Sequence, residues 1–193
     1  MASIVPIVEG HSEASAVPDL LRRLCHREGR YDVQIGKAFR VKRYKVVKDK
    51  ELERSLSFAV RTRGADAAIV LLDSDDDCPV QLASALRARA EAEVHIPVGV
   101  ICAERELETW FLAAKESLRG KCGIRLNAQC VPDAERIRDA KKRLTQNMEG
   151  DRRYLEVADQ QALVHSLDLD LAEARSRSFR KLCDEVRRLL ALL

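Results

Sequence analysis

The sequence lacks the features that mark membrane proteins and secreted proteins. Its 193 residues contain no run of about 18 consecutive apolar residues, the length that a membrane-spanning helix needs. The N-terminus shows no basic leader followed by a long apolar segment, so we expect no signal peptide. These absences predict a cytoplasmic protein that does not associate with a membrane.

Paired cysteines are also missing. None of the six cysteines forms a Cys-x-x-Cys pair, and no His-x-x-x-His helix turn accompanies them. We therefore expect neither a zinc knuckle nor a disulfide framework, but reduced cysteines, several of them buried as small hydrophobic side chains. They are Cys25, Cys78, Cys102, Cys122, Cys130 and Cys183.

A strong net charge is absent as well. The formal net charge is +3, so any case for a nucleic-acid ligand must come from local clusters of charge. Hydrophobic residues make up 46% of the chain and charged residues 34%, which excludes a disordered chain and is enough for a packed core. The length fits one domain, or one domain with a small addition.

Apolar runs and helical repeats alternate through the first 115 residues. The predicted strands are 3–8, 33–41, 67–72 and 96–102, and the predicted helices are 13–28, 50–63, 79–93 and 104–115. This alternation predicts an α/β fold with a parallel sheet flanked by helices. A loop over residues 116–132 then leads into helices only. We therefore predict a core over residues 1–115 and a C-terminal helical extension, residues 116–193, that packs on it.

Acidic side chains directly follow three of the predicted strands. The carboxyl ends of parallel strands meet at one edge of a sheet, where ligands bind. Carboxylates crowded at that edge repel one another unless a cation lies among them, and Mg²⁺ prefers oxygen ligands. The sequence therefore predicts a site for Mg²⁺ or Mn²⁺. The candidate ligands are Glu9, Glu13, Asp73, Asp75, Asp77, Glu104 and Glu106.

Each of these acids also has a purely structural interpretation. Asp77 could cap the helix that starts near Pro79. Glu13, Glu104 and Glu106 could stabilise the N-termini of helices through the helix dipole. Other phosphoryl-transfer folds fit less well. A haloacid-dehalogenase phosphatase would carry its Asp-x-Asp after the first strand, and a receiver domain would need paired acids there.

Basic residues concentrate between positions 37 and 50, with Phe39 and Tyr44 among them. Such a segment could bind phosphates through salt-sensitive attraction, and its aromatic rings could stack on bases. A solvated edge strand protected by lysines would show the same pattern, and the sequence leaves both interpretations open. The candidate nucleic-acid contacts are Lys37, Arg40, Lys42, Arg43 and Lys45.

Two acidic motifs resemble those of TOPRIM domains, in which a glutamate follows strand one and an Asp-x-Asp follows strand three. They are Val8-Glu9-Gly10-His11-Ser12-Glu13 and Asp73-Ser74-Asp75. The first motif is similar to that of the overcoming-lysogenization-defect (OLD) nucleases. It also resembles an uncharacterised TOPRIM-like family that is often encoded beside ATPases in prokaryotic genomes. Further segments resemble signatures of that family: residues 104–112, Asp159-Gln160-Gln161 and Ser176-Arg177-Ser178-Phe179.

The resemblance implies a TOPRIM-like (Rossmann-like) parallel sheet and metal-dependent hydrolysis of phosphodiester bonds in nucleic acid. It makes Glu9 a general acid–base or a metal ligand, and it makes Asp73 and Asp75 metal ligands in the catalytic centre. Glu13 matches the second acid of the nuclease form. One further ligand would be Glu104 or Glu106, with no choice between them.

The resemblance also implies partners. It points to nucleic acid and to an ATPase partner protein within a prokaryotic defence or toxin module. No tyrosine stands where a topoisomerase nucleophile could be argued, and the chain is too short for the template-binding modules of a primase. The alternative is a non-catalytic TOPRIM scaffold that binds nucleic acid or a partner protein. The oligomeric state stays open.

Overall fold

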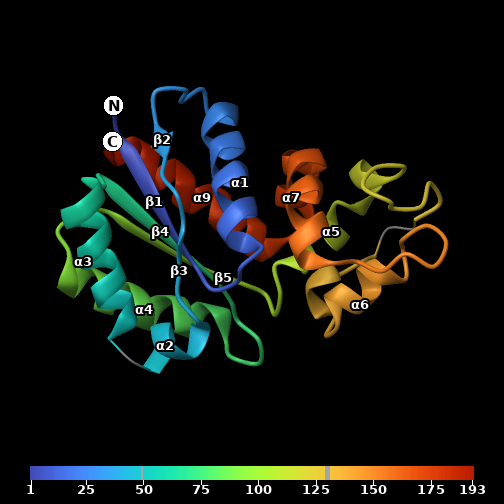
Figure 1. Ribbon diagram of the computed structural model, residues 1–193, viewed down its shortest axis with the longest axis horizontal. Helices are drawn as coiled ribbons and strands as arrows, with labels where there is room; N and C mark the ends of the chain where they lie inside the picture. Colours follow the sequence, from blue (N-terminus) through green and yellow to red (C-terminus); the bar gives the residue numbers. More distant parts are fainter. Residues whose placement is uncertain (49, 129–130) are drawn as a thin grey trace.

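A parallel β-sheet lies among helices in the half of the molecule that is on the left in Figure 1. The computed structural model describes residues 1–48, 50–128 and 131–193. The strands are β1 (Ser3–Val8), β2 (Gln34–Ile35), β3 (Phe39–Arg40), β4 (Ala67–Asp73) and β5 (Val98–Ala103). They are ordered β2-β1-β4-β5, β3 also pairs with β1, and every pairing is parallel.

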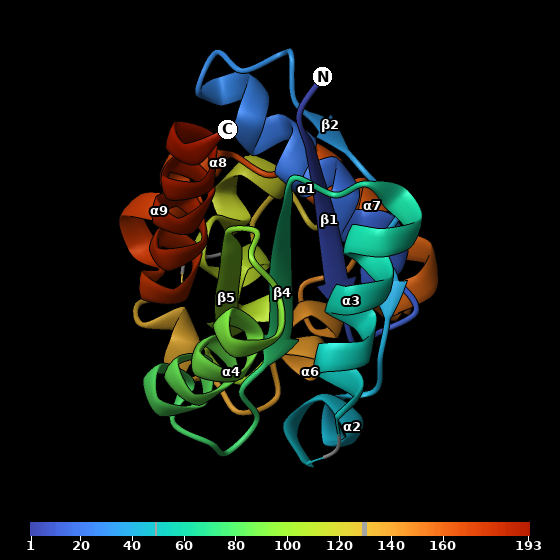
Figure 2. The ribbon, with the colours of Figure 1, turned by 90° about the vertical axis from the view of Figure 1, so that its left-hand side faces the viewer.

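Helices cover both faces of this sheet. The helices of the chain are α1 (Glu13–Arg27), α2 (Arg43–Lys48), α3 (Glu51–Arg63), α4 (Pro79–Glu93), α5 (Glu108–Ala113), α6 (Ala140–Thr145), α7 (Glu156–Ser166), α8 (Leu169–Arg175) and α9 (Arg177–Leu192), with 3₁₀ turns η1 (Lys115–Leu118) and η2 (Ala134–Arg136). Successive side chains of β4 point to opposite faces of the sheet. Ile69 and Leu71 join the core formed with α1 and α9, whereas Val70 and Leu72 meet α3 and α4 (Figure 2). The predicted α/β fold, with its parallel sheet and C-terminal helices, is confirmed.

The predicted single strand over residues 33–41 is wrong. The register pairs Ile4 of β1 with Ile35 and Ile7 with Phe39, so three steps along β1 face four along its neighbour. One extra residue on the edge is a bulge, which divides the strand into β2 and β3. Gly36 lies at this interruption, where a Cβ would come within 3.2 Å of a valine side chain of β1. Glycine therefore allows the edge to approach β1 closely there.

The helix predicted over residues 104–115 begins later, at Glu108. Arg105 has a φ of 61°, in the left-handed region that a right-handed helix excludes. The loop after β4 holds this conformation, because the Arg105 amide donates to Ser74 Oγ at 2.8 Å and the Asp75 amide donates to the Arg105 carbonyl at 3.1 Å. The loops that follow β4 and β5 are thus joined to each other before α5 starts.

The start of α9 is fixed by a buried polar cluster. Glu135 Oε1 accepts hydrogen bonds from Ser176 Oγ at 2.7 Å and from the Ser178 amide at 2.8 Å. Trp110, which is fully buried, donates through Nε1 to Ser178 Oγ at 2.8 Å and packs edge-on against Phe179. The Ser-Arg-Ser-Phe signature is therefore a structural joint between α5, η2 and α9.

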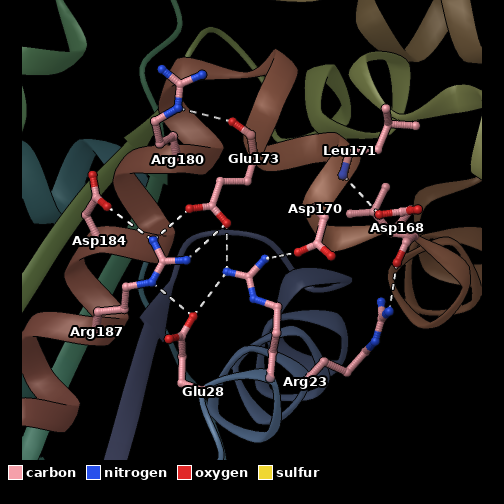
Figure 3. A network of polar contacts seen from close by, with 11 residues as sticks. Arg23, Glu28, Asp168, Asp170, Leu171, Glu173, Arg180, Asp184 and Arg187 are labelled. Carbon is pink, nitrogen blue, oxygen red and sulfur yellow. Dashed lines mark hydrogen bonds and ion pairs between the residues drawn. The ribbon is translucent and has the colours of Figure 1, made fainter.

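A second polar network joins α1 to α8 and α9 (Figure 3). Glu173 lies at its centre, and its carboxylate receives Arg27 at 2.9 Å and Arg187 at 2.7 Å. Arg187 also pairs with Glu28 at 3.0 Å. These ion pairs therefore hold together helices that are far apart in the sequence.

The described cysteines are all free. Cys25, Cys102 and Cys183 are buried, as the sequence predicts for reduced, apolar cysteines. Cys130 lies outside the described residues. Within the part of the chain that the structure describes, no helix has the length and apolar character to cross a membrane.

Candidate metal centre

Two acids at the end of β1 form the first part of the site. Glu9 follows the strand directly, and Glu13 is the first residue of α1. The Glu13 side chain folds back under the turn, where its Oε2 accepts the amides of Glu9 at 3.1 Å and Gly10 at 3.0 Å. A Cβ at Gly10 would lie 3.1 Å from Glu13 Cδ, so the glycine leaves room for the carboxylate.

Asp73 completes the site from the neighbouring strand. It is the last residue of β4, and its side chain is buried. Its Oδ1 accepts the Leu107 amide at 2.8 Å, which fixes the carboxylate at the strand end. One carboxylate oxygen each from Glu9, Glu13 and Asp73 lies within 4.8 Å of the others. We call these three residues the acidic triad.

Burial and mutual repulsion make the triad electrostatically unfavourable on its own. Burial, with repulsion from Glu13 and Asp75, raises the pKa of Glu9 to about 7. Burial, with repulsion from the other triad carboxylates, raises the pKa of Asp73 well above its usual range. Burial likewise raises the pKa of Glu13. A cation among the three oxygens would relieve this repulsion.

The other predicted ligands lie outside the triad. Asp75 and Asp77 have exposed side chains, and both face Arg43. Glu106 accepts the Lys141 amide through Oε2 at 3.3 Å, and Glu104 is half-buried in the turn before α5. The structure therefore brings Glu9 and Glu13, after β1, together with Asp73 at the end of β4, and it brings neither the acids in the loop after β4 nor Glu104 and Glu106 after β5 into the same group.

A buried group next to the triad was not singled out from the sequence. Glu108 is 1% exposed and accepts hydrogen bonds from Tyr154 Oη at 2.9 Å and Gln160 Nε2 at 3.4 Å. Burial raises the pKa of Glu108 to about 7, and its charge acts on Asp73. The sequence did carry a signal, because Glu108 and Gln160 both belong to signature segments. The position of Glu108 in the sequence, however, gave no reason to prefer it over Glu104 and Glu106.

Lys141 supplies positive charge on the same side. It is the second residue of α6, and its Nζ lies 3.1 Å from Glu156 Oε1. Its charge also acts on Glu13 and Glu108. The sequence placed no element around this lysine, so its position beside the triad comes from the structure alone.

The basic segment forms a short helix, α2, after the bulged edge. Lys37, Arg40 and Lys42 are exposed, and Lys45 is half-buried. Arg43 turns inward to the loop after β4. The two aromatic residues differ as well. Tyr44 is 53% exposed, whereas Phe39 packs edge-on against Phe58 and under Arg63.

Comparison with protein families finds one match over most of the chain. The model of a family described as "Domain of unknown function (DUF4276)" matches residues 8–187. No curated protein matches the sequence.

Solved structures with a similar fold come from OLD proteins. The C-terminal region of the Burkholderia pseudomallei OLD protein is 15% identical, with a TM-score of 0.51 over 97% of this chain and 98% of that chain. The C-terminal region of the Xanthomonas campestris pv. campestris OLD protein, phased with iodine, is 14% identical, with a TM-score of 0.48 over 98% of this chain and 96% of that chain. The Burkholderia likeness shows a shared fold, so the relation to OLD proteins expected from the sequence is confirmed at the level of the fold.

Proposed function

The chain belongs to the DUF4276 family, and on that premise we propose that it is a metal-dependent nuclease whose metal site is the acidic triad. The observation that carries the proposal is the convergence of Glu9, Glu13 and Asp73 from the ends of two adjacent parallel strands. The TOPRIM-like motifs and the fold shared with an OLD C-terminal region support it.

The donor set fits a hard divalent cation. All three side chains offer carboxylate oxygens, two of them are buried, and no cysteine or histidine belongs to the group. Mg²⁺ and Mn²⁺ take such oxygen ligands and keep several waters, which suits a site with few protein ligands. When bound, the ion would polarise a scissile phosphate and lower the pKa of a coordinated water.

The chain's own residues would supply the remaining chemistry. Glu9 has a pKa of about 7 without an ion, and as a ligand its carboxylate would be held ionised by the bound cation. Lys141 lies close enough to act electrostatically on Glu13 and would attract a phosphate to the same side. The exposed cations Lys37, Arg40 and Lys42 would contact the flanking phosphates through salt-sensitive attraction. An ATPase partner stays a prediction of the resemblance.

Calorimetric titration of the metal-free chain with Mg²⁺ and Mn²⁺ tests this proposal. We expect binding by the wild type and at least a 10-fold loss of affinity in Asp73→Asn, which keeps the acceptor for the Leu107 amide but removes a buried charge. Asp76→Asn is the matched control, because Asp76 is an 85% exposed acid in the same loop. The rates at which these three proteins cleave single- and double-stranded DNA and RNA should rank in the same order as their metal affinities. A folded wild type that binds neither ion, with or without nucleic acid, would leave the non-catalytic scaffold as the better description.

A further inference from the structure

One arginine lies among the acids of the loop after β4. Arg43 is the first residue of α2, and its Nε donates to the main-chain oxygen of Asp73 at 2.9 Å. Its Nη2 donates to the main-chain oxygen of Ser74 at 3.1 Å and to the carboxylate of Asp77. Its Nε also lies 3.4 Å from Asp75 Oδ2. A single guanidinium therefore contacts four residues of one loop.

The helix that carries Arg43 is itself anchored. Val46 is fully buried against the sheet, and Arg89 Nη1 donates to the carbonyls of Val46 at 2.8 Å and Val47 at 2.9 Å. Arg89 is held in turn by a two-point ion pair with Glu53. The C-terminal part of α2 is thus fixed, and Arg43 reaches the loop from the first residue of this anchored helix.

We propose that the Arg43 guanidinium takes the place of a second divalent cation, so that the chain binds one ion, at the acidic triad. This inference rests on the proposed function. In two-metal sites the ions lie about 4 Å apart and are bridged by shared ligands. Here the carboxylates next to the triad, Asp75 and Asp77, already face a fixed positive charge.

Space and charge both oppose a second ion at that position. An ion bound by Asp75 and Asp77 would need their oxygens at about 2.1 Å, in the volume that the guanidinium fills. The guanidinium keeps its charge at every pH the protein withstands, so it would also repel a dication. Arg43 is accordingly a positioning residue, because it orders the loop that begins at Asp73 of the triad.

Counting bound Mn²⁺ tests this assignment without any activity assay. Calorimetry, with electron paramagnetic resonance to quantify free Mn²⁺, should give one ion per wild-type chain and two per Arg43→Gln chain. Arg43→Lys keeps the charge and should bind one. Lys42→Gln is the neighbouring control, because Lys42 is exposed and has no ion pair among the described residues, and it should also bind one.

Other outcomes would overturn the proposal. Two ions bound to the wild-type chain would overturn the role of Arg43 but not the proposed metal site. No bound ion would overturn both proposals. If an Arg43→Gln chain with the wild-type melting temperature binds one ion, Arg43 does not determine the number of bound ions. If Arg43→Gln does not fold, the Asp75→Asn, Asp77→Asn double variant decides. This double variant should still bind one ion. If it binds none, Asp75 or Asp77 is a ligand of that ion.

Discussion

Asp73 shows how far a single residue could be predicted from the sequence. An apolar run that ends in aspartate predicts a buried strand with a carboxylate at its carboxyl end, and both features are present. The same reasoning places Glu9 at the end of β1, beside Asp73. Glu108 could not be placed in this way, because its burial depends on Tyr154 and Gln160, which lie far away in the sequence.

The raised pKa of Glu9 predicts how stability changes with pH in the absence of metal. Its pKa is about 7 in the folded protein against an ordinary 4.5, so the folded state binds more protons than the unfolded state between these values. The free energy of unfolding should therefore fall as pH rises through this window. Allowing for the partial exposure of the side chain, we expect Glu9 to contribute roughly 2 kcal/mol.

Urea unfolding at pH 5 and pH 8, with EDTA present, measures this effect. Glu9→Gln removes one titrating group and should lose roughly 2 kcal/mol less stability between the two pH values than the wild type does, because Glu13, Asp73 and Glu108 still titrate with raised pKa values. Glu91→Gln, at an exposed glutamate of α4, should behave like the wild type. An unchanged pH dependence in Glu9→Gln would show that Glu9 titrates normally.

At the scale of elements, the longer helices α1, α3 and α4 and the buried strands followed from periodicity, whereas the edge of the sheet and the short helix α2 after it did not. Residues 33–41 alternate like one strand, but the extra residue at the bulge depends on how closely Gly36 approaches β1. Likewise, the helical pattern before Glu108 is overridden by two hydrogen bonds to the loop after β4, one donated by the Arg105 amide to Ser74 and one accepted by the Arg105 carbonyl from Asp75. These are tertiary contacts, and a local sequence pattern cannot predict them.

The polar joint at the start of α9 gives a prediction about that helix. Glu135 accepts three hydrogen bonds there from Ser176 and Ser178, so Glu135→Ala would leave both serines without their shared acceptor. We expect the free energy of unfolding to fall by roughly 2 kcal/mol. Chemical denaturation, with Glu91→Ala as a control for losing an exposed glutamate, measures it. A loss no larger than the control's would show that the joint adds nothing to stability.

For the whole molecule, the network around Glu173 joins the first helix of the chain to the last two. Glu173→Gln removes one charge that serves both Arg27 and Arg187. We expect it to lower the free energy of unfolding by roughly 1 kcal/mol in dilute buffer, and by less in 1 M salt, where such pairs are screened.

Asp184→Asn is the matched control for this change, because Asp184 is 57% exposed and its one ion pair within the described residues is with Arg187, at 3.4 Å. Denaturation curves of both variants at low and high salt would separate the network from a single surface pair. Equal losses in the two variants, or a loss in Glu173→Gln that does not depend on salt, would contradict a cooperative charge network.

The position of β4 has a consequence for the dynamics of the site. All seven residues of this strand are buried, and its backbone is hydrogen-bonded on both sides, to β1 and to β5. Its amide protons should therefore be among the slowest in the chain to exchange with deuterium. Asp73 is attached to the end of this segment, so the ion would find one of its ligands already immobile. Binding should slow exchange in the turn at residues 9–13 and leave the strand almost unchanged.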